Sequence, residues 1–163
     1  PSALDPIRAD AACRVVHAMV SFPELVSGTG RACAILMRAS AGRAAVKTGA
    51  EGFYAGIIPE RGLGIALKID DGASRGAETT IAFVLDRMGL LGEDKAARAI
   101  LEAPVLNTRN ETVGTRRVSE MLAGSPLRCE LLLTAPRAGR STRSVASAFG
   151  RVAGGGPRNE YRA

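Results

Sequence analysis

The stretch KTGAEGFYAGIIPERGLGIALKID, residues 47–70, predicts two antiparallel strands joined by a tight turn. Residues 53–58 and 63–69 are rich in apolar side chains, and the Pro-Glu-Arg-Gly sequence between them suits a four-residue turn. Apolar residues at 63, 65, 67 and 69 alternate with small or polar ones, which gives the second strand one wholly apolar face. Gly42 opens a further strand candidate, which runs through Val46 and Lys47. The region therefore predicts a sheet of at least three strands.

Helical patterns flank this strand region on both sides. Asp5 followed by Pro6 is typical of a helix start, and apolar residues then recur at positions 12, 15, 16 and 19 until Pro23 interrupts the pattern. Residues 78–88 have the same period and stop at Gly89, and a shorter helix is expected from about 93 to 102. Residues 34–37 fit either a helical turn or a buried strand. The predicted fold class is α+β, an antiparallel sheet flanked by helices.

The charge of the chain divides it into two parts. The 163 residues carry a net charge of +6, but residues 122–163 hold seven of the arginines against two glutamates, so residues 1–121 are almost neutral. The segment from 122 onward is rich in Arg and Gly and shows no periodicity, a composition typical of a disordered tail. We therefore expect a folded part over 1–121 and an irregular basic tail over 122–163.

Composition argues against several classes of partner. An aromatic content of 4% without tryptophan disfavours a stacking platform for single-stranded nucleic acid, so no nucleic-acid partner is expected. No apolar run approaches the roughly 18 residues of a membrane span, so no membrane partner is expected either. Cys13, Cys33 and Cys129 are odd in number and widely spaced, which favours a reduced, cytoplasmic protein over a disulfide-stapled one.

Lys47-Thr48-Gly49 is the motif that carries chemistry. A Lys-Thr-Gly strand is one of three parts of the penicillin-recognising serine enzymes, the others being Ser-x-x-Lys and Ser-Asp-Asn. A lysine beside a nucleophile stabilises developing negative charge, a threonine hydroxyl binds a substrate carboxylate, and a glycine lets substrate approach the strand. The alternative interpretation of the tripeptide is a solvated lysine at a strand end.

A longer pattern extends this motif. Residues 47–78, with MVSFPELVSGTGR (19–31) and LMRASAGR (36–43) before them, closely resemble the C-terminal part of the asparaginase II family over roughly residues 7–118. The resemblance implies a fold like that of serine β-lactamases and serine-dependent glutaminases, and hydrolysis of the side-chain amide of L-asparagine. It implies that Lys47 is catalytic, as the lysine that assists a serine nucleophile. It implies that Thr48, Gly49, Ala50, Glu51 and Gly52 lie along the substrate cleft. Thr29, Arg31 and Cys33, in and just after the loop upstream of the Lys47 strand, are further substrate-binding candidates.

The sequence departs from the family in one decisive respect. The positions three before its lysines are Ala44, Ile65 and Gly92, so it contains no Ser-x-x-Lys, and it contains no Ser-Asp-Asn. The family's metal-associated segment also belongs upstream, so no metal or other cofactor is expected in this chain. We predict an asparaginase-type amidohydrolase represented by its C-terminal part, with L-asparagine as the small-molecule partner and a homodimer as a further option. The isolated chain is expected to be inactive unless another serine, such as Ser27 or Ser74, acts as nucleophile.

Two other functions stay open. One is a serine-dependent glutaminase or β-lactamase-like hydrolase, and the other is a non-catalytic remnant with a basic binding tail. His17, the only histidine, lies on a predicted helix and is expected to be structural or exposed. Cys33 fits a small buried side chain as well as a cleft residue. Asp70 and Asp71 precede a helix and fit a turn with an N-cap, and Lys68 is expected to face solvent.

Overall fold

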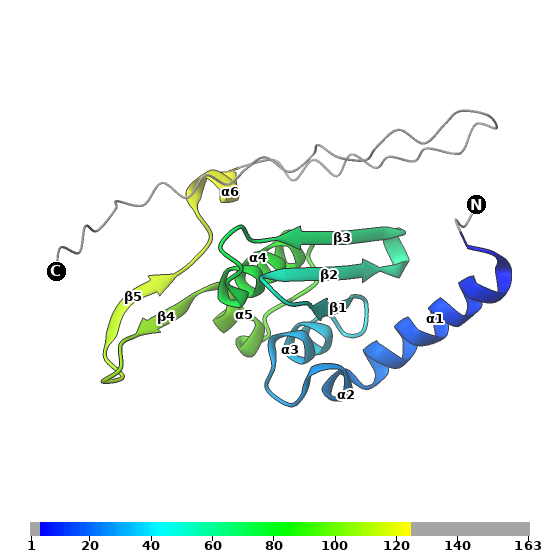
Figure 1. Ribbon diagram of the computed structural model, residues 1–163, viewed down its shortest axis with the longest axis horizontal. Helices are drawn as coiled ribbons and strands as arrows, with labels where there is room; N and C mark the ends of the chain where they lie inside the picture. The colour runs from blue at the N-terminus through cyan, green and yellow to red at the C-terminus, as the bar shows by residue number, and fades with distance from the viewer. Residues whose placement is uncertain (1–3, 125–163) are drawn as a thin grey trace. The chain divides into compact units, whose positions relative to one another are not determined.

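The computed structural model describes residues 4–124, which form helices and two antiparallel sheets (Figure 1). This confirms the α+β prediction, whereas all but the first three residues of the predicted tail lie outside the described part of the chain. The elements are α1 (Pro6–Ser21), α2 (Pro23–Ser27), α3 (Ala32–Ala39), β1 (Ala45–Thr48), β2 (Phe53–Ile58), the 3-10 turn η1 (Pro59–Arg61), β3 (Leu63–Lys68), α4 (Ser74–Arg87), α5 (Lys95–Leu101), β4 (Ala103–Leu106), β5 (Thr112–Arg116) and α6 (Glu120–Gly124).

The first sheet has the strand order β1-β2-β3, with both neighbouring pairs antiparallel as predicted. The turn between β2 and β3 is η1, and Gly62 closes it in the left-handed conformation at φ 61°. β1 begins at Ala45 and not at residue 42. The physical reason is that Ala41 and Gly42 have positive φ angles of 52° and 76°, which end α3 and do not fit an extended strand.

One face of this sheet is buried against helices. α3 contacts β1, and α4 contacts β2 and β3. Residues 34–37, which the sequence left open between helix and strand, lie in α3, and Leu36 and Met37 are fully buried there. Ile81 and Leu85 of α4 meet Tyr54 of β2 in the same cluster, as the helical period over 78–88 predicted. On the other face Ile57 of β2 is 45% exposed, so only one side of the sheet forms the core.

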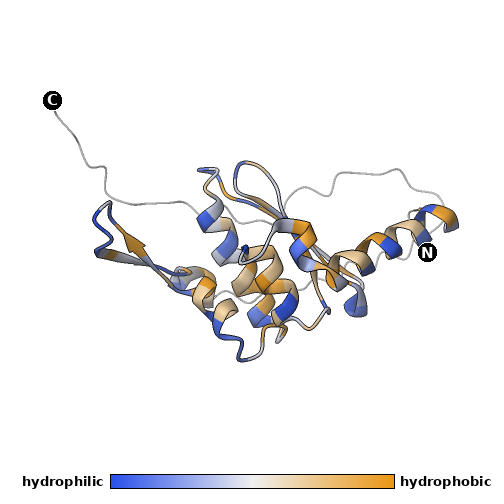
Figure 2. Ribbon diagram, turned by 90° about the horizontal axis from the view of Figure 1, so that it is seen from below, coloured by the Kyte–Doolittle hydropathy of each residue, from blue (hydrophilic) through white to orange (hydrophobic). Residues whose placement is uncertain are grey.

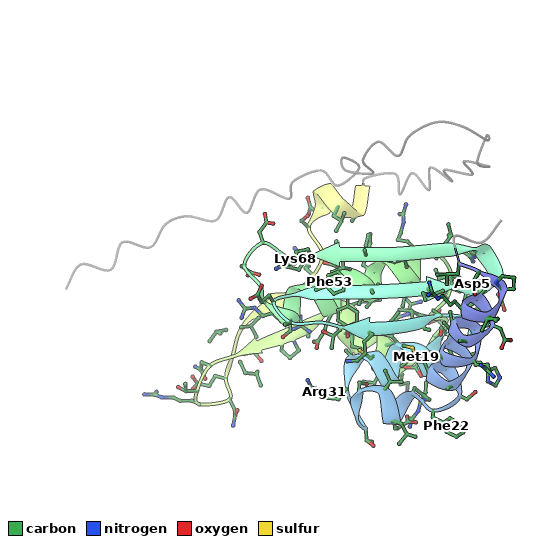
Figure 3. All side chains as sticks on the ribbon, turned by 45° about the vertical axis from the view of Figure 1, so that its right-hand side comes forward. Asp5, Met19, Phe22, Arg31, Phe53 and Lys68 are labelled. Carbon is green, nitrogen blue, oxygen red and sulfur yellow. The ribbon has the colours of Figure 1, made fainter. Side chains whose placement is uncertain are left out.

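α1 is longer than α3 and hardly buried. Asp5 caps its first turn by accepting a hydrogen bond from the Arg8 N–H, and Pro6 occupies the first helical position, as predicted. The expected apolar face is largely exposed, because α1 contains no buried residue and Val15 is 60% exposed. Met19 is the part of that face that packs against the core (Figure 3).

Two further features depart from the sequence predictions. α4 begins at Ser74, four residues early, and Asp71 does not cap it, because its carboxylate accepts a hydrogen bond from the Ala73 N–H in the turn before the helix (2.8 Å). The β4–β5 hairpin was not predicted. Pro104 lies within β4, and a two-stranded sheet tolerates it because one side of each strand needs no partner. None of the helices within residues 4–124 has the length and apolarity to cross a membrane.

Candidate functional site

A cavity of about 120 Å³ opens where β1 ends beside α3 and α4. It is smaller than the roughly 300–1,000 Å³ typical of a complete small-molecule site. Its walls come from the end of α2, the start of α3, the end of β1, the start of β2 and the first turns of α4. The lining residues are Ser27, Arg31, Ala32, Cys33, Lys47, Thr48, Tyr54 and Glu78.

Lys47 lines this cavity from the third position of β1. Its side chain is exposed, and its ammonium donates a hydrogen bond to the carbonyl of Thr48 (3.3 Å). Within residues 4–124, β1 is an edge strand of the three-stranded sheet, and Lys47 stands near its end.

A polar network fixes the floor of the cavity. The backbone N–H of Thr48 donates to Cys33 Sγ (3.3 Å), and Cys33 Sγ is 3.2 Å from the hydroxyl of Tyr54, where either group can donate. Cross-strand pairing brings Tyr54 opposite Thr48. Burial, followed by the hydrogen bond with Cys33, raises the pKa of the Tyr54 phenol above its usual value, so the phenol is protonated at neutral pH. Cys33 is only 1% exposed, so it belongs to the packed core and also lines the cavity.

Charged side chains surround this floor. Arg31 precedes α3, and Glu78 extends from α4; together with Lys47 they give the lining two positive charges and one negative. A second cavity of about 200 Å³ shares Arg31, Ala32 and Glu78 with the first. The buried hydroxyl of Ser27 also lines the first cavity and has no hydrogen-bond partner within the described residues. The site can therefore accept an anion or a zwitterion.

Four of the nine predicted site residues meet in this cavity: Arg31, Cys33, Lys47 and Thr48. The other five, Thr29, Gly49, Ala50, Glu51 and Gly52, are not among its lining residues.

Two of these five residues, Gly49 and Gly52, have no room for a side chain. A Cβ on Gly49 would stand 2.8 Å from the Phe53 ring, and one on Gly52 would stand 2.9 Å from the carbonyl carbon of Gly72. Lys68, exposed as predicted, donates hydrogen bonds to the carbonyls of Glu51 and Ile69 (Figure 3). The β1–β2 turn is therefore held by its own packing and by Lys68.

Sequence reasoning assigned no site role to Tyr54, Glu78 or Ala32, and considered Ser27 only as a substitute nucleophile. The one available signal was pairing, because a hairpin in the observed register places Tyr54 opposite Thr48. For Glu78 the sequence indicated only the start of a helix. His17 is exposed on α1 and does not line the cavity, and Ser74 is exposed at the start of α4. Residues 4–124 contain no group of three or more His, Cys, Asp or Glu side chains arranged to hold a metal ion.

Comparison with known protein families identifies the family of the chain. A family model described as L-asparaginase II matches residues 1–118, a range that contains every residue lining the two cavities and ends just after β5. Among curated proteins, none matches the chain. Because the family model covers most of the sequence, the chain belongs to the L-asparaginase II family.

Proposed function

We propose that this chain supplies the lysine-bearing part of the active site of an amidohydrolase that converts L-asparagine to aspartate and ammonia. The observation that carries the proposal is that Lys47 and Thr48 line one cavity with Arg31 and Glu78, in a sequence of the asparaginase family. Residues 1–121 would be the C-terminal part of the catalytic domain, and 122–163 a separate basic segment.

The proposed reaction uses a serine outside this sequence. The serine attacks the side-chain amide carbon, ammonia leaves, and water hydrolyses the resulting acyl-enzyme. Lys47 would stabilise the negative charge that develops at the reacting centre, and the Thr48 hydroxyl, which hydrogen-bonds to the Gly49 carbonyl at 3.2 Å, would bind substrate. The small cavity, and the position of β1 at the edge of its sheet within residues 4–124, support a site that is completed by another segment.

α1 gives independent support for a missing segment. This helix has an apolar face, yet none of its residues is buried, and Ile7 is 82% exposed. A segment that carries a Ser-x-x-Lys pair could cover α1 while it brings the serine to Lys47. Preference for glutamine, or a β-lactamase-like hydrolysis, would use the same residues. The only observation that favours a non-catalytic remnant is the absence of Ser-x-x-Lys from this sequence. A homodimer remains part of the proposal.

The test compares two proteins in an ammonia-release assay with L-asparagine. The 163-residue chain should give no release above background, because loss of a nucleophile removes on the order of 10⁶-fold of the rate in a serine hydrolase. The same chain, extended by the upstream coding sequence up to a Ser-x-x-Lys segment and cut after residue 121, should be active.

Lysine variants of the extended protein identify the residue. Lys47→Ala should abolish most of the activity, whereas the matched control Lys95→Ala, an exposed lysine on α5, should retain it. Strong hydrolysis by the 163-residue chain that disappears in Ser27→Ala would show that Ser27 is the nucleophile. A folded extended protein with no activity on asparagine, glutamine or a β-lactam would leave a binding remnant as the function.

A further inference from the structure

Arg31 and Glu78 are opposite charges that line the same two cavities without pairing with each other. The ion pairs described within residues 4–124 involve Arg8, Arg14, Arg38 and Arg98, and none involves Arg31 or Glu78. The guanidinium of Arg31 and the carboxylate of Glu78 also make no hydrogen bond within that part of the chain. Two unpaired opposite charges on one cavity wall are suited to a ligand that carries both complementary charges.

We infer that Arg31 and Glu78 form the recognition pair for the charged head of a free α-amino acid, with Arg31 binding the α-carboxylate and Glu78 the α-ammonium. This inference rests on the proposed function, because it assigns the part of asparagine that is not cleaved. It selects free amino acids over asparagine within a peptide, which has neither charged group.

The backbone holds both residues firmly. The Arg31 N–H donates to the Gly28 carbonyl (3.3 Å), and the Arg31 carbonyl accepts the first hydrogen bond of α3 from Ile35 (3.0 Å). Glu78 lies between Ala77 and Thr79, which are both buried, and the Thr79 hydroxyl donates to the Ile100 carbonyl (3.2 Å). Figure 3 shows Arg31 at the start of α3. The two charges therefore extend from fixed points on α3 and α4.

Electrostatics places both charges near the same hydroxyl group. Burial is the main cause that raises the pKa of Tyr54; the Glu78 carboxylate raises this pKa further and the Arg31 guanidinium lowers it, so both charges act on the phenol at the cavity floor. Glu78 is half-buried, and a carboxylate in that position without a partner is costly. An ammonium group that bound there would remove this cost, and a carboxylate would match the planar donor fork of Arg31.

Lys47 then faces the other end of the ligand. It lines the first cavity with Arg31 and Glu78 but does not line the second, so a head group between Arg31 and Glu78 would point its side chain toward Lys47 and Thr48. Ala32, a residue with a small side chain, lines both cavities beside the pair. The arrangement accounts for the amide end of asparagine reaching the lysine.

The experiment titrates the 163-residue chain with three ligands and follows its backbone amides by NMR. L-Asparagine carries both charges, succinamate lacks the ammonium, and L-asparagine amide lacks the α-carboxylate. Glu78→Gln should weaken L-asparagine binding about tenfold or more and leave succinamate binding unchanged. Arg31→Gln should weaken L-asparagine binding similarly and leave L-asparagine amide binding unchanged.

Matched controls are Arg75→Gln and Glu60→Gln, exposed residues outside both cavities, which should change binding of no ligand. A Glu78→Gln variant that binds all three ligands equally weakly, or all as well as the parent chain, overturns the inference. So does the absence of shifts at cavity residues at the solubility limit of L-asparagine.

The result also separates this inference from the proposed hydrolysis. Charge-matched selectivity in a chain whose extended form releases no ammonia would leave the recognition pair standing and remove the hydrolase. An active extended protein in which Glu78→Gln leaves KM for L-asparagine unchanged would remove the recognition pair alone.

Discussion

α1 and α3, which are separated in the chain by the short helix α2, have opposite relations to the core. α1 spans 16 residues and buries none of them, whereas α3 spans eight and buries Cys33, Ala34, Leu36 and Met37. Figure 2 shows that α1 nevertheless carries apolar residues along its length. The shorter helix therefore fixes the site, because Cys33 on α3 accepts a hydrogen bond from Thr48 and Arg31, directly before α3, lines the cavity.

Different forces hold the two helices. α1 is stabilised by its cap and by exposed ion pairs such as Asp10–Arg14 (3.4 Å), which contribute about 0–1 kcal/mol each. α3 is too short to be stable alone, and tertiary packing holds it. An ion pair between Arg38 and Glu24 also joins α3 to α2. Substitutions in the two regions should therefore have very different costs.

The largest difference is expected between the same substitution at a buried position of α3 and at an exposed position of α2, the helix that lies between α1 and α3 in the chain. Leu36→Ala removes a fully buried side chain and should cost about 3–5 kcal/mol of unfolding free energy, because it loses burial and leaves a cavity. Leu25→Ala, at a position on α2 that is 85% exposed, should change it by less than about 0.5 kcal/mol. Urea unfolding followed by circular dichroism measures both. Similar losses would show that Leu25 is covered in solution.

A pair of glycines tests the same contrast at the backbone. Gly52 and Gly62 have similar φ angles of 68° and 61°, but Gly52 is buried against Gly72, whereas a Cβ on Gly62 would meet no atom within 4 Å beyond its chain neighbours. Gly62→Ala should cost about 1 kcal/mol for the left-handed backbone. Gly52→Ala should cost about 2–3 kcal/mol, because the methyl group also meets backbone atoms. Equal costs in urea unfolding would mean that the β1–β2 turn can move away from Gly72.

Local sequence patterns correctly predicted the elements whose turns and caps are formed by residues close together in the chain. The β2–β3 hairpin follows from alternation and its turn, and the start of α1 from Asp5 and Pro6. The helical state of residues 34–37 did not follow, because a short apolar run fits a buried strand equally well and packing decides between them. The β4–β5 hairpin was missed because Pro104 argues against a strand, except at an edge.

The sequence predicted only those site residues that lie on the motif strand or in the segment just before it. Lys47 and Thr48 were predicted from a tripeptide, and Arg31 and Cys33 from their place in and just after the loop that precedes the strand. Glu78 lies 31 positions beyond Lys47 and reaches the cavity because α4 packs on the sheet. No periodicity within α4 separates a carboxylate at a cavity from one in solvent. Long-range packing supplies that information, and a single sequence does not display it.

The smallest effect concerns two aspartates that make the same local contact. Asp5 caps α1 by accepting from the Arg8 N–H (3.0 Å), and Asp94 caps α5 by accepting from the Ala97 N–H (2.8 Å). Loss of such a cap costs about 1 kcal/mol of helix stability. Ala97 is fully buried in the core, so α5 cannot fray without disturbing it. Asp94→Ala should therefore lower the global unfolding free energy by about 1 kcal/mol.

Asp5→Ala should leave the global unfolding free energy nearly unchanged, because the first turns of α1 can open without exposing core residues. The loss should instead appear as faster amide hydrogen exchange over residues 9–13, which urea unfolding does not report. Asp94→Ala should accelerate exchange across the core as well. If Asp5→Ala lowers global stability as much as Asp94→Ala does, α1 unfolds together with the core. Its exposed apolar face would then contribute to folding, and the contrast between α1 and α3 would fail.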